Sequence, residues 1–160
     1  MSRILSILII VAVALVVTAP AWAGEMEEKQ EVINQVKETW KKIAAKEVDA
    51  VGVGPNGVIQ AQSHGGFWRS FTPETMAAFL KESPNMRFTP YYIEVRFLGS
   101  KKDVAYVTHY LVGTIVREGK DDIANYRTRA SSVMEKIDGR WVTAGSHYSP
   151  LFGGSGIQAN

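Results

Sequence analysis

The chain has 160 residues, a formal net charge of +2 and no cysteine. This length gives one ordinary domain with room for a hydrophobic core. A charge so close to zero gives no electrostatic basis for nucleic-acid binding. The absence of cysteine excludes disulfides, thiol chemistry and a lipid-anchored lipoprotein.

The first 23 residues are typical of a secretory signal peptide. Arg3 supplies the positive start, residues 4–17 are apolar or small apart from one serine, and Ala21-Trp22-Ala23 has the small-x-small cleavage pattern. The apolar segment is shorter than a membrane-spanning helix requires. We expect bacterial export to the periplasm or the medium, cleavage before Gly24, and no stable membrane anchor on the mature protein.

Two helices are predicted early in the mature chain. Residues 25–46 repeat apolar side chains at steps of three and four, as an amphipathic helix does, and carry acids early and lysines late, as the helix dipole favours. A second helix is expected from Thr72-Pro73-Glu74, which supplies a hydroxyl cap, a proline at the first helical position and an acid. It should run to about Glu82, before Pro84.

Strands are expected on both sides of the second helix. Before it come a short strand over residues 58–62 and a loop over residues 63–70. From Met86 the hydrophobic period changes to two. This pattern predicts a meander of long antiparallel strands over residues 86–98, 103–117, 123–136 and 140–148. Helices followed by such strands indicate an α+β fold, with helices on one face of a curved sheet and water or another subunit on the other.

The most informative feature is the pair of strands around Asp138-Gly139, a strong hairpin signal. Alternate residues of a strand share a face. Arg129, Ser131 and Val133 are therefore expected to share one face. The same rule groups a set on the last strand: Trp141, Thr143, Gly145, His147 and Ser149. An Arg and a His-x-Ser on neighbouring strands can converge on one small anionic or polar ligand; the alternative is a sheet with a few satisfied polar side chains.

These motifs make the chain resemble the nuclear transport factor 2-like superfamily, in its SnoaL-like and ketosteroid-isomerase-homologue branches, over residues 30–150. The resemblance is carried by the following motifs: the helix end Lys46-Glu47-Val48-Asp49-Ala50, the strand start Asp103-Val104-Ala105, Arg129-x-Ser131-x-Val133, and Asp138-Gly139-x-Trp141 with His147-x-Ser149. Two departures are the breakers Gly52, Gly54 and Pro55, where the family usually continues a second helix, and Gly145, where many relatives have a bulky residue or His.

The resemblance implies a cone-shaped, curved antiparallel sheet wrapped around N-terminal helices, with a deep pocket between them and commonly a dimer. It divides the chain into a signal peptide (1–23), a SnoaL-like domain (24–152) and a flexible tail (153–160). The fold hosts isomerases, cyclases, hydrolases and silent binding domains, so the resemblance alone does not name a reaction.

Arg129 is the first candidate for the substrate pocket, together with Ser131, Ser149 and Trp68. Its guanidinium could bind a carboxylate or another anion, or it could pair with Glu94 or cover apolar surface. Ser149 is expected to satisfy the backbone or a neighbouring histidine rather than attack a substrate. Trp68, with Phe67, could form an aromatic lip over the pocket or pack under the second helix.

The candidate catalytic residues are His147 and His109, because an imidazole titrates near neutral pH. The alternative for His147 is a structural tie to a neighbouring loop. The alternative for His109, in phase with Val107 and Leu111, is a satisfied core residue. Glu94 is expected to form a cross-strand ion pair rather than act as a catalytic base, and the acid pair of a ketosteroid isomerase is not evident.

No cofactor is expected, and the spacing of the three histidines argues against a metal site. Trp141 is expected in the core. The opposite face of the strand over residues 103–117 is rich in apolar and amphipathic residues, and patches that large are rarely left to water, which predicts a homodimer. These residues are Val104, Tyr106, Tyr110, Val112 and Val116.

The leading hypothesis is an exported protein that binds a small, partly apolar molecule in the cone pocket. The first alternative is an acid–base enzyme acting on a small carbonyl compound, with His147 or His109 as base and Arg129 stabilising negative charge. The second alternative is a non-catalytic dimerisation module.

Overall fold

The computed structural model describes the backbone of residues 2–48, 52–151 and 153, and the side chains of residues 23–48, 52–151 and 153. The chain divides into two compact units, Met1–Glu31 and Val32–Asn160, and the sheet lies in the second. Within the described residues, no helix is long and apolar enough to span a membrane. Residues 154–160 of the predicted tail lie outside the described residues, as do Asp49 and Ala50.

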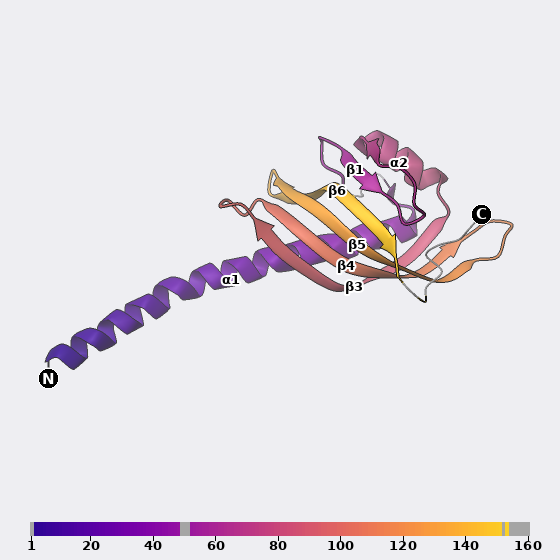
Figure 1. The fold of residues 1–160 in the computed structure, drawn as a ribbon. Coiled ribbons are helices and arrows are strands. Elements are labelled where there is room, and N and C mark those ends of the chain that lie inside the picture. The colour runs from indigo at the N-terminus through magenta and orange to yellow at the C-terminus, as the bar shows by residue number, and fades with distance from the viewer. Residues whose placement is uncertain (1, 49–51, 152, 154–160) are drawn as a thin grey trace. The chain divides into compact units, whose positions relative to one another are not determined.

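Helix α1 covers Ser2–Ala45 (Figure 1). Its end agrees with the sequence prediction, but its expected start at residue 25 is wrong, because the helix already includes the residues before it. In the full chain, the acids after Gly24 therefore lie within the helix, and its first turn holds no acid. The amphipathic pattern is confirmed from Val32 onward, where Val32, Val36 and Trp40 are all buried.

Helix α2, Pro73–Glu82, begins and ends as predicted. Thr72 caps it: the Thr72 hydroxyl accepts a hydrogen bond from the Thr75 amide, and the Thr75 hydroxyl accepts one from the Thr72 amide. Such reciprocal caps satisfy amides that a helix start otherwise leaves unpaired. Two residues of the helix, Met76 and Leu80, are buried in the core.

The four long strands are β3 (Asn85–Leu98), β4 (Val104–Val116), β5 (Ile123–Ile137) and β6 (Arg140–Pro150). They pair as an antiparallel meander, which confirms the prediction. At the last turn, Asp138 and Gly139 both have positive φ, and Ile137 faces Arg140. These are the backbone angles that a two-residue hairpin requires and that Asp-Gly tolerates.

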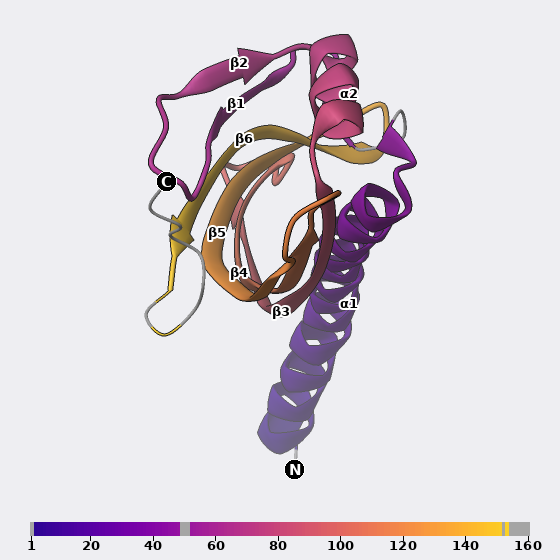
Figure 2. The same cartoon turned by 90° about the vertical axis from the view of Figure 1, so that its right-hand side faces the viewer.

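The sheet is mixed rather than purely antiparallel, because a short hairpin extends it. Strand β1 (Val58–Ala61) pairs parallel with β6, and β2 (Arg69–Phe71) pairs antiparallel with β1. The order is β2-β1-β6-β5-β4-β3. Strand β2 includes Arg69 and Ser70, which were expected in a loop; three residues are too few to show a period. Figure 2 shows the long strands curving, with the sheet left unclosed.

The core lies between the helices and one face of the sheet, here called the helix-covered face. Trp40 of α1 contacts Phe88 of β3 and Tyr148 of β6, with ring centroids 5.5 and 6.0 Å apart. Trp141 is buried, as predicted, and its ring stacks on Phe97 at 5.6 Å. The opposite face is called the outer face; it includes Tyr106 and Tyr110, both about two-fifths exposed.

Strand β6 contains a bulge that determines which residues reach each face. Val133 of β5 faces Gly145, but the next residue, Met134, faces Thr143. Ala144 is thus the extra residue. Because one inserted residue reverses the alternation of a strand, the two ends of β6 present opposite sets of side chains to the core.

Candidate functional site

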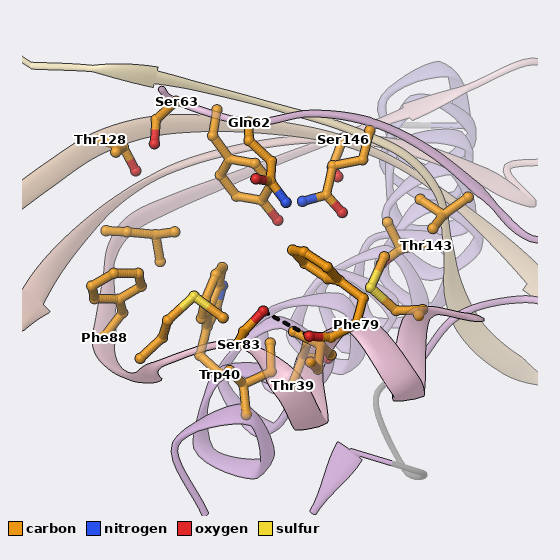
Figure 3. Close-up of a pocket in the computed structure, with 18 of the residues that line it drawn as sticks. Thr39, Trp40, Gln62, Ser63, Phe79, Ser83, Phe88, Thr128, Thr143 and Ser146 are labelled. Atoms are coloured by element: carbon orange, nitrogen blue, oxygen red, sulfur yellow. Dashed lines mark hydrogen bonds between the residues drawn. The ribbon is translucent and has the colours of Figure 1, made fainter. Parts of the chain in front are cut away.

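A cavity of about 370 Å³ lies between the two helices and the helix-covered face of the sheet (Figure 3). Helix α1 contributes Trp40, and α2 contributes Phe79 and Leu80. The long strands and the chain after β1 supply the other walls. A concave, mainly apolar cavity with a few polar groups is the usual form of a small-molecule site.

Aromatic and aliphatic side chains make one wall of the cavity, here called the helix wall. Trp40 recurs on the buried stripe of α1, and Phe88 follows from the period of two in β3. The Phe88 ring also stacks on Tyr126 of β5, with centroids 5.1 Å apart and planes 14° apart. Interlocked rings of this kind hold their shape, because each is constrained by its neighbours.

Uncharged polar side chains make the facing wall, here called the strand wall. It comprises the following residues of β1, β5, β6 and the segment after β1: Gln60, Gln62, Ser63, Tyr126, Thr128, Thr143, Ser146 and Tyr148. Ser63 and Tyr126 share a hydrogen bond between their hydroxyls. Burial raises the pKa of the Tyr148 hydroxyl, while a hydrogen bond with Ser146 opposes the rise, so Tyr148 stays protonated at neutral pH.

The described lining of the cavity carries no Asp, Glu, Lys or Arg. Its only imidazole is that of His64, which is exposed. General acid–base catalysis needs a group that titrates near the working pH within reach of the substrate. A neutral cavity also penalises a charged ligand, because no opposite charge offsets the lost hydration. The arrangement therefore favours binding of an uncharged molecule.

Four of the predicted site residues lie elsewhere, on the outer face. Arg129, Ser131, His147 and Ser149 line an open groove of about 530 Å³ there, with Glu94 and tyrosines of β3 and β4. Ser131 faces His147 across the strands, and Arg129 faces Ser149. The Arg129 Nε donates a hydrogen bond to the Ser149 Oγ at 3.1 Å. The predicted convergence occurs, but not in the pocket beneath the helices.

The bulge at Ala144 explains this displacement. Strict alternation puts Trp141, Thr143 and His147 on one face, and that expectation is wrong. Trp141 and Thr143 face the core, whereas Gly145, His147 and Ser149 face outward. The grouping of Arg129 with Ser131 and Val133 is confirmed, since β5 is regular there.

The remaining candidates on the outer face lack the expected partners. No described carboxylate lies within ion-pair distance of Arg129, so the pair with Glu94, which was one alternative for this arginine, is not formed. Trp68 is 63% exposed, and its ring centroid lies 5.9 Å from that of His147. Trp68 does not line the cavity. Both expectations for it, a lip over that pocket and packing under α2, are therefore wrong. Catalytic roles for these residues stay predictions.

His109 lies on the helix-covered face, in phase with the buried Val107 and Leu111, although it also borders the outer groove that Arg129 lines. It faces Ala130 across the strands and is 4% exposed. Neither of its ring nitrogens has a hydrogen-bond partner among the described residues. Burial lowers the pKa of His109 from 6.5 to about 4, since the charged imidazolium would lose its hydration. It is therefore a neutral core residue at physiological pH. It is not the hydrogen-bonded core residue that the sequence suggested as an alternative, because both ring nitrogens lack partners among the described residues.

The strand wall was missed because its residues carry no catalytic signature. Gln60 is in β1 and Gln62 follows that strand directly, two residues later, while Tyr126 and Thr128 alternate with the two arginines of β5. One signal was available: uncharged polar residues recur at every second position on strand faces that are expected to be buried. No group of described residues could hold a metal ion.

The buried His109 gives a prediction about pH. Its pKa is about 4 in the folded protein and 6.5 ordinarily, so between these values the unfolded chain binds the extra proton. Stability should therefore fall as pH drops through this window, by roughly 3 kcal/mol in full, and should not change on this account above it. Urea unfolding at pH 7 and pH 4.5 should show that loss in the wild type and not in His109→Leu; equal losses would contradict it.

Comparison with known proteins agrees with this architecture. An NTF-2-like protein of unknown function from Shewanella oneidensis MR-1 is 25% identical, with a TM-score of 0.54 over 75% of this chain and 97% of that chain. An NTF2-like protein with a cystatin-like fold from Novosphingobium aromaticivorans is 12% identical, with a TM-score of 0.67 over 85% and 90%. The association domain of C. elegans CaMKII is 17% identical, with a TM-score of 0.62 over 79% and 98%.

No curated protein gives a significant match to the chain. The structural neighbours share the nuclear transport factor 2-like fold, which confirms the α+β architecture that the sequence predicted. The parallel pairing of β1 with β6 was not predicted. Residues 33–153 match the SnoaL-like domain family. That span covers the sheet, α2 and α1 from Ile33 onward, and the chain therefore belongs to the SnoaL-like domain family.

Proposed function

We propose that the protein binds a small, uncharged and mostly apolar molecule in the cavity between its helices and sheet. The observation that carries this proposal is the cavity itself: about 370 Å³, bounded by aromatic side chains such as Trp40 and Phe88, with polar but uncharged groups on the facing wall. Burial of an apolar ligand there would be driven by the area it removes from water.

The alternative of an acid–base enzyme receives less support from the geometry. It assigned the base to His147 or His109 and charge stabilisation to Arg129. Of these, His147 and Arg129 lie on the outer face, and His109 has both nitrogens buried away from the cavity lining. A base must come within hydrogen-bond reach of the proton that it removes. Ligand binding is therefore the function that the geometry supports best.

Filling the cavity should abolish binding. Met86 of β3 lines it and is partly buried, so the larger indole of Met86→Trp should occupy the space that a ligand needs. We expect the affinity for 2-methylnaphthalene, measured by titration calorimetry, to fall at least tenfold. Met26→Trp, at a residue that is 69% exposed on α1, is the matched control and should bind normally. Equal affinities for both variants would place the ligand outside the cavity.

We also propose that two copies associate through the outer face. The face exposes several large apolar side chains, including Tyr92 at 81%, Tyr106 at 42% and Val133 at 37%. Glu94 and Arg129 lie on it, and neither has an ion-pair partner among the described residues. A twofold arrangement could pair each with its opposite on the other copy. A fold neighbour is described as an association domain.

A charge placed in this surface should separate the copies. Val133→Glu adds a carboxylate on the outer face, where its desolvation would oppose association. Sedimentation at micromolar concentration should give a dimer for the wild type and a monomer for Val133→Glu. Met26→Glu, exposed on α1, should leave the dimer intact. A monomeric wild type would sink the proposal.

Finally, we propose that the protein is exported and cleaved after Ala23. The support is the arrangement of Arg3, the apolar segment over residues 4–17 and Ala21-Trp22-Ala23. N-terminal sequencing of protein recovered from the periplasm or medium of a bacterial host should begin at Gly24. Recovery of a chain that still carries residues 4–17 would count against cleavage.

A further inference from the structure

The two walls of the cavity differ in how their polar groups are satisfied (Figure 3). On the helix wall, the Ser83 hydroxyl donates to the Phe79 carbonyl oxygen at 2.7 Å, and Thr39 accepts from the Gln35 amide at 3.4 Å. These hydroxyls are already engaged within the protein. On the strand wall, by contrast, some polar groups have no such partner among the described residues.

Thr128 is the clearest of these groups. Its side chain is 1% exposed, it lines the cavity, and its Oγ1 has no hydrogen-bond partner among the described residues. The neighbouring polar pair, Ser63 and Tyr126, is engaged in its own hydrogen bond. Buried hydroxyls are nearly always paired, because an unpaired one costs free energy. A hydroxyl orphaned at a cavity wall is explained if a bound molecule supplies its partner.

Two amides on the same wall extend this pattern. Gln60 and Gln62 alternate along the chain at β1, so both face the cavity, and both are partly buried. Neither amide has a hydrogen-bond partner within the described part of the chain. Each amide offers two donors and one acceptor. A ligand facing this wall would therefore meet donors and acceptors together, and no charge.

We infer that the cavity selects an uncharged ligand with a polar edge, such as a carboxamide, that hydrogen-bonds to Thr128 and Gln62 while its apolar body packs against Trp40. This inference rests on the proposed ligand-binding function and adds the chemical class and the orientation of the ligand. A carboxamide both donates and accepts, which matches the mixed groups of the strand wall. A carboxylate of the same shape only accepts and brings a charge into a cavity without a cation.

Three probes with one ring system separate these contributions: 2-methylnaphthalene, 2-naphthamide and 2-naphthoate. All three offer the same naphthalene to the helix wall and differ only in the group presented to the strand wall. At pH 7, titration calorimetry should show 2-naphthamide binding at least tenfold more tightly than 2-naphthoate. Equal or tighter binding of the carboxylate would overturn the inference.

Variants then assign the selectivity to the named residues. Thr128→Val and Gln62→Leu keep nearly the same volume and remove the hydrogen-bonding groups. Each variant should weaken the affinity for 2-naphthamide by about fivefold to tenfold, the usual effect of losing one hydrogen bond. The affinity for 2-methylnaphthalene should stay within about twofold of the wild type. Thr108→Val makes the same substitution on the outer face and should change neither affinity. Parallel losses for both probes would mean that the residues only shape the cavity.

The unliganded protein supplies an independent readout. If the Thr128 hydroxyl is unpaired without ligand, Thr128→Val should raise the melting temperature by roughly 2–5 °C, because it removes a buried group without a partner. Thr128→Ser retains the hydroxyl and should retain the preference for 2-naphthamide even if it lowers stability. A marked fall in melting temperature for Thr128→Val would reveal a protein partner for the hydroxyl and overturn the inference.

The outcomes also separate this inference from the function on which it rests. If none of the three probes binds, the proposed ligand-binding function fails, and the inference fails with it. If 2-methylnaphthalene binds but 2-naphthamide does not, the cavity binds apolar molecules and the inferred polar selectivity is wrong.

Discussion

One inserted residue in the last strand determines how the chemistry of this protein is distributed. Ala144 forms a bulge between Thr143 and Gly145, so the alternation of β6 reverses there. Before the bulge Trp141 enters the core; after it Ser146 and Tyr148 face the cavity, and His147 is turned outward. Without the bulge, His147 would face the helices, and the cavity would hold a second imidazole, besides that of His64, in place of a serine hydroxyl and a tyrosine. The neutral character of the cavity therefore depends on this local irregularity.

The bulge also shows where sequence reasoning reaches its limit. The four long strands, the Asp138-Gly139 turn and helix α2 follow from periodicity, turn chemistry and capping, all of which are local. Which residues face the core after Thr143 cannot be predicted from the local sequence. It depends on register against β5, and a single extra residue exchanges the two faces. The sequence correctly grouped Arg129 with Ser131 and Val133 on one face of β5. It did not show that this face is the outer one.

The residues of the strand wall were hidden for a different reason. Glutamine, threonine and serine occur on many surface strands, and nothing in Gln60 or Thr128 alone distinguishes a cavity group from a solvated one. Their significance arises from burial combined with missing partners, which only the packed structure displays. The short strand β2 was missed because it depends on pairing with β1 rather than on a pattern of its own. The helices, by contrast, carry their buried stripe in the sequence.

The distribution of unpaired polar groups suggests why this core tolerates them. His109 and Thr128 both lie on the helix-covered face, and both have buried polar atoms without a partner in the part of the chain that the structure describes. Each costs stability, since natural cores normally pair such groups. Thr128 stands at the cavity wall, where a bound molecule can compensate the cost; His109 does not line the cavity. Similar local environments therefore have different consequences. We infer that a bound ligand offsets the cost of the threonine, whereas we expect the histidine, which does not line the cavity, to make the fold sensitive to acid.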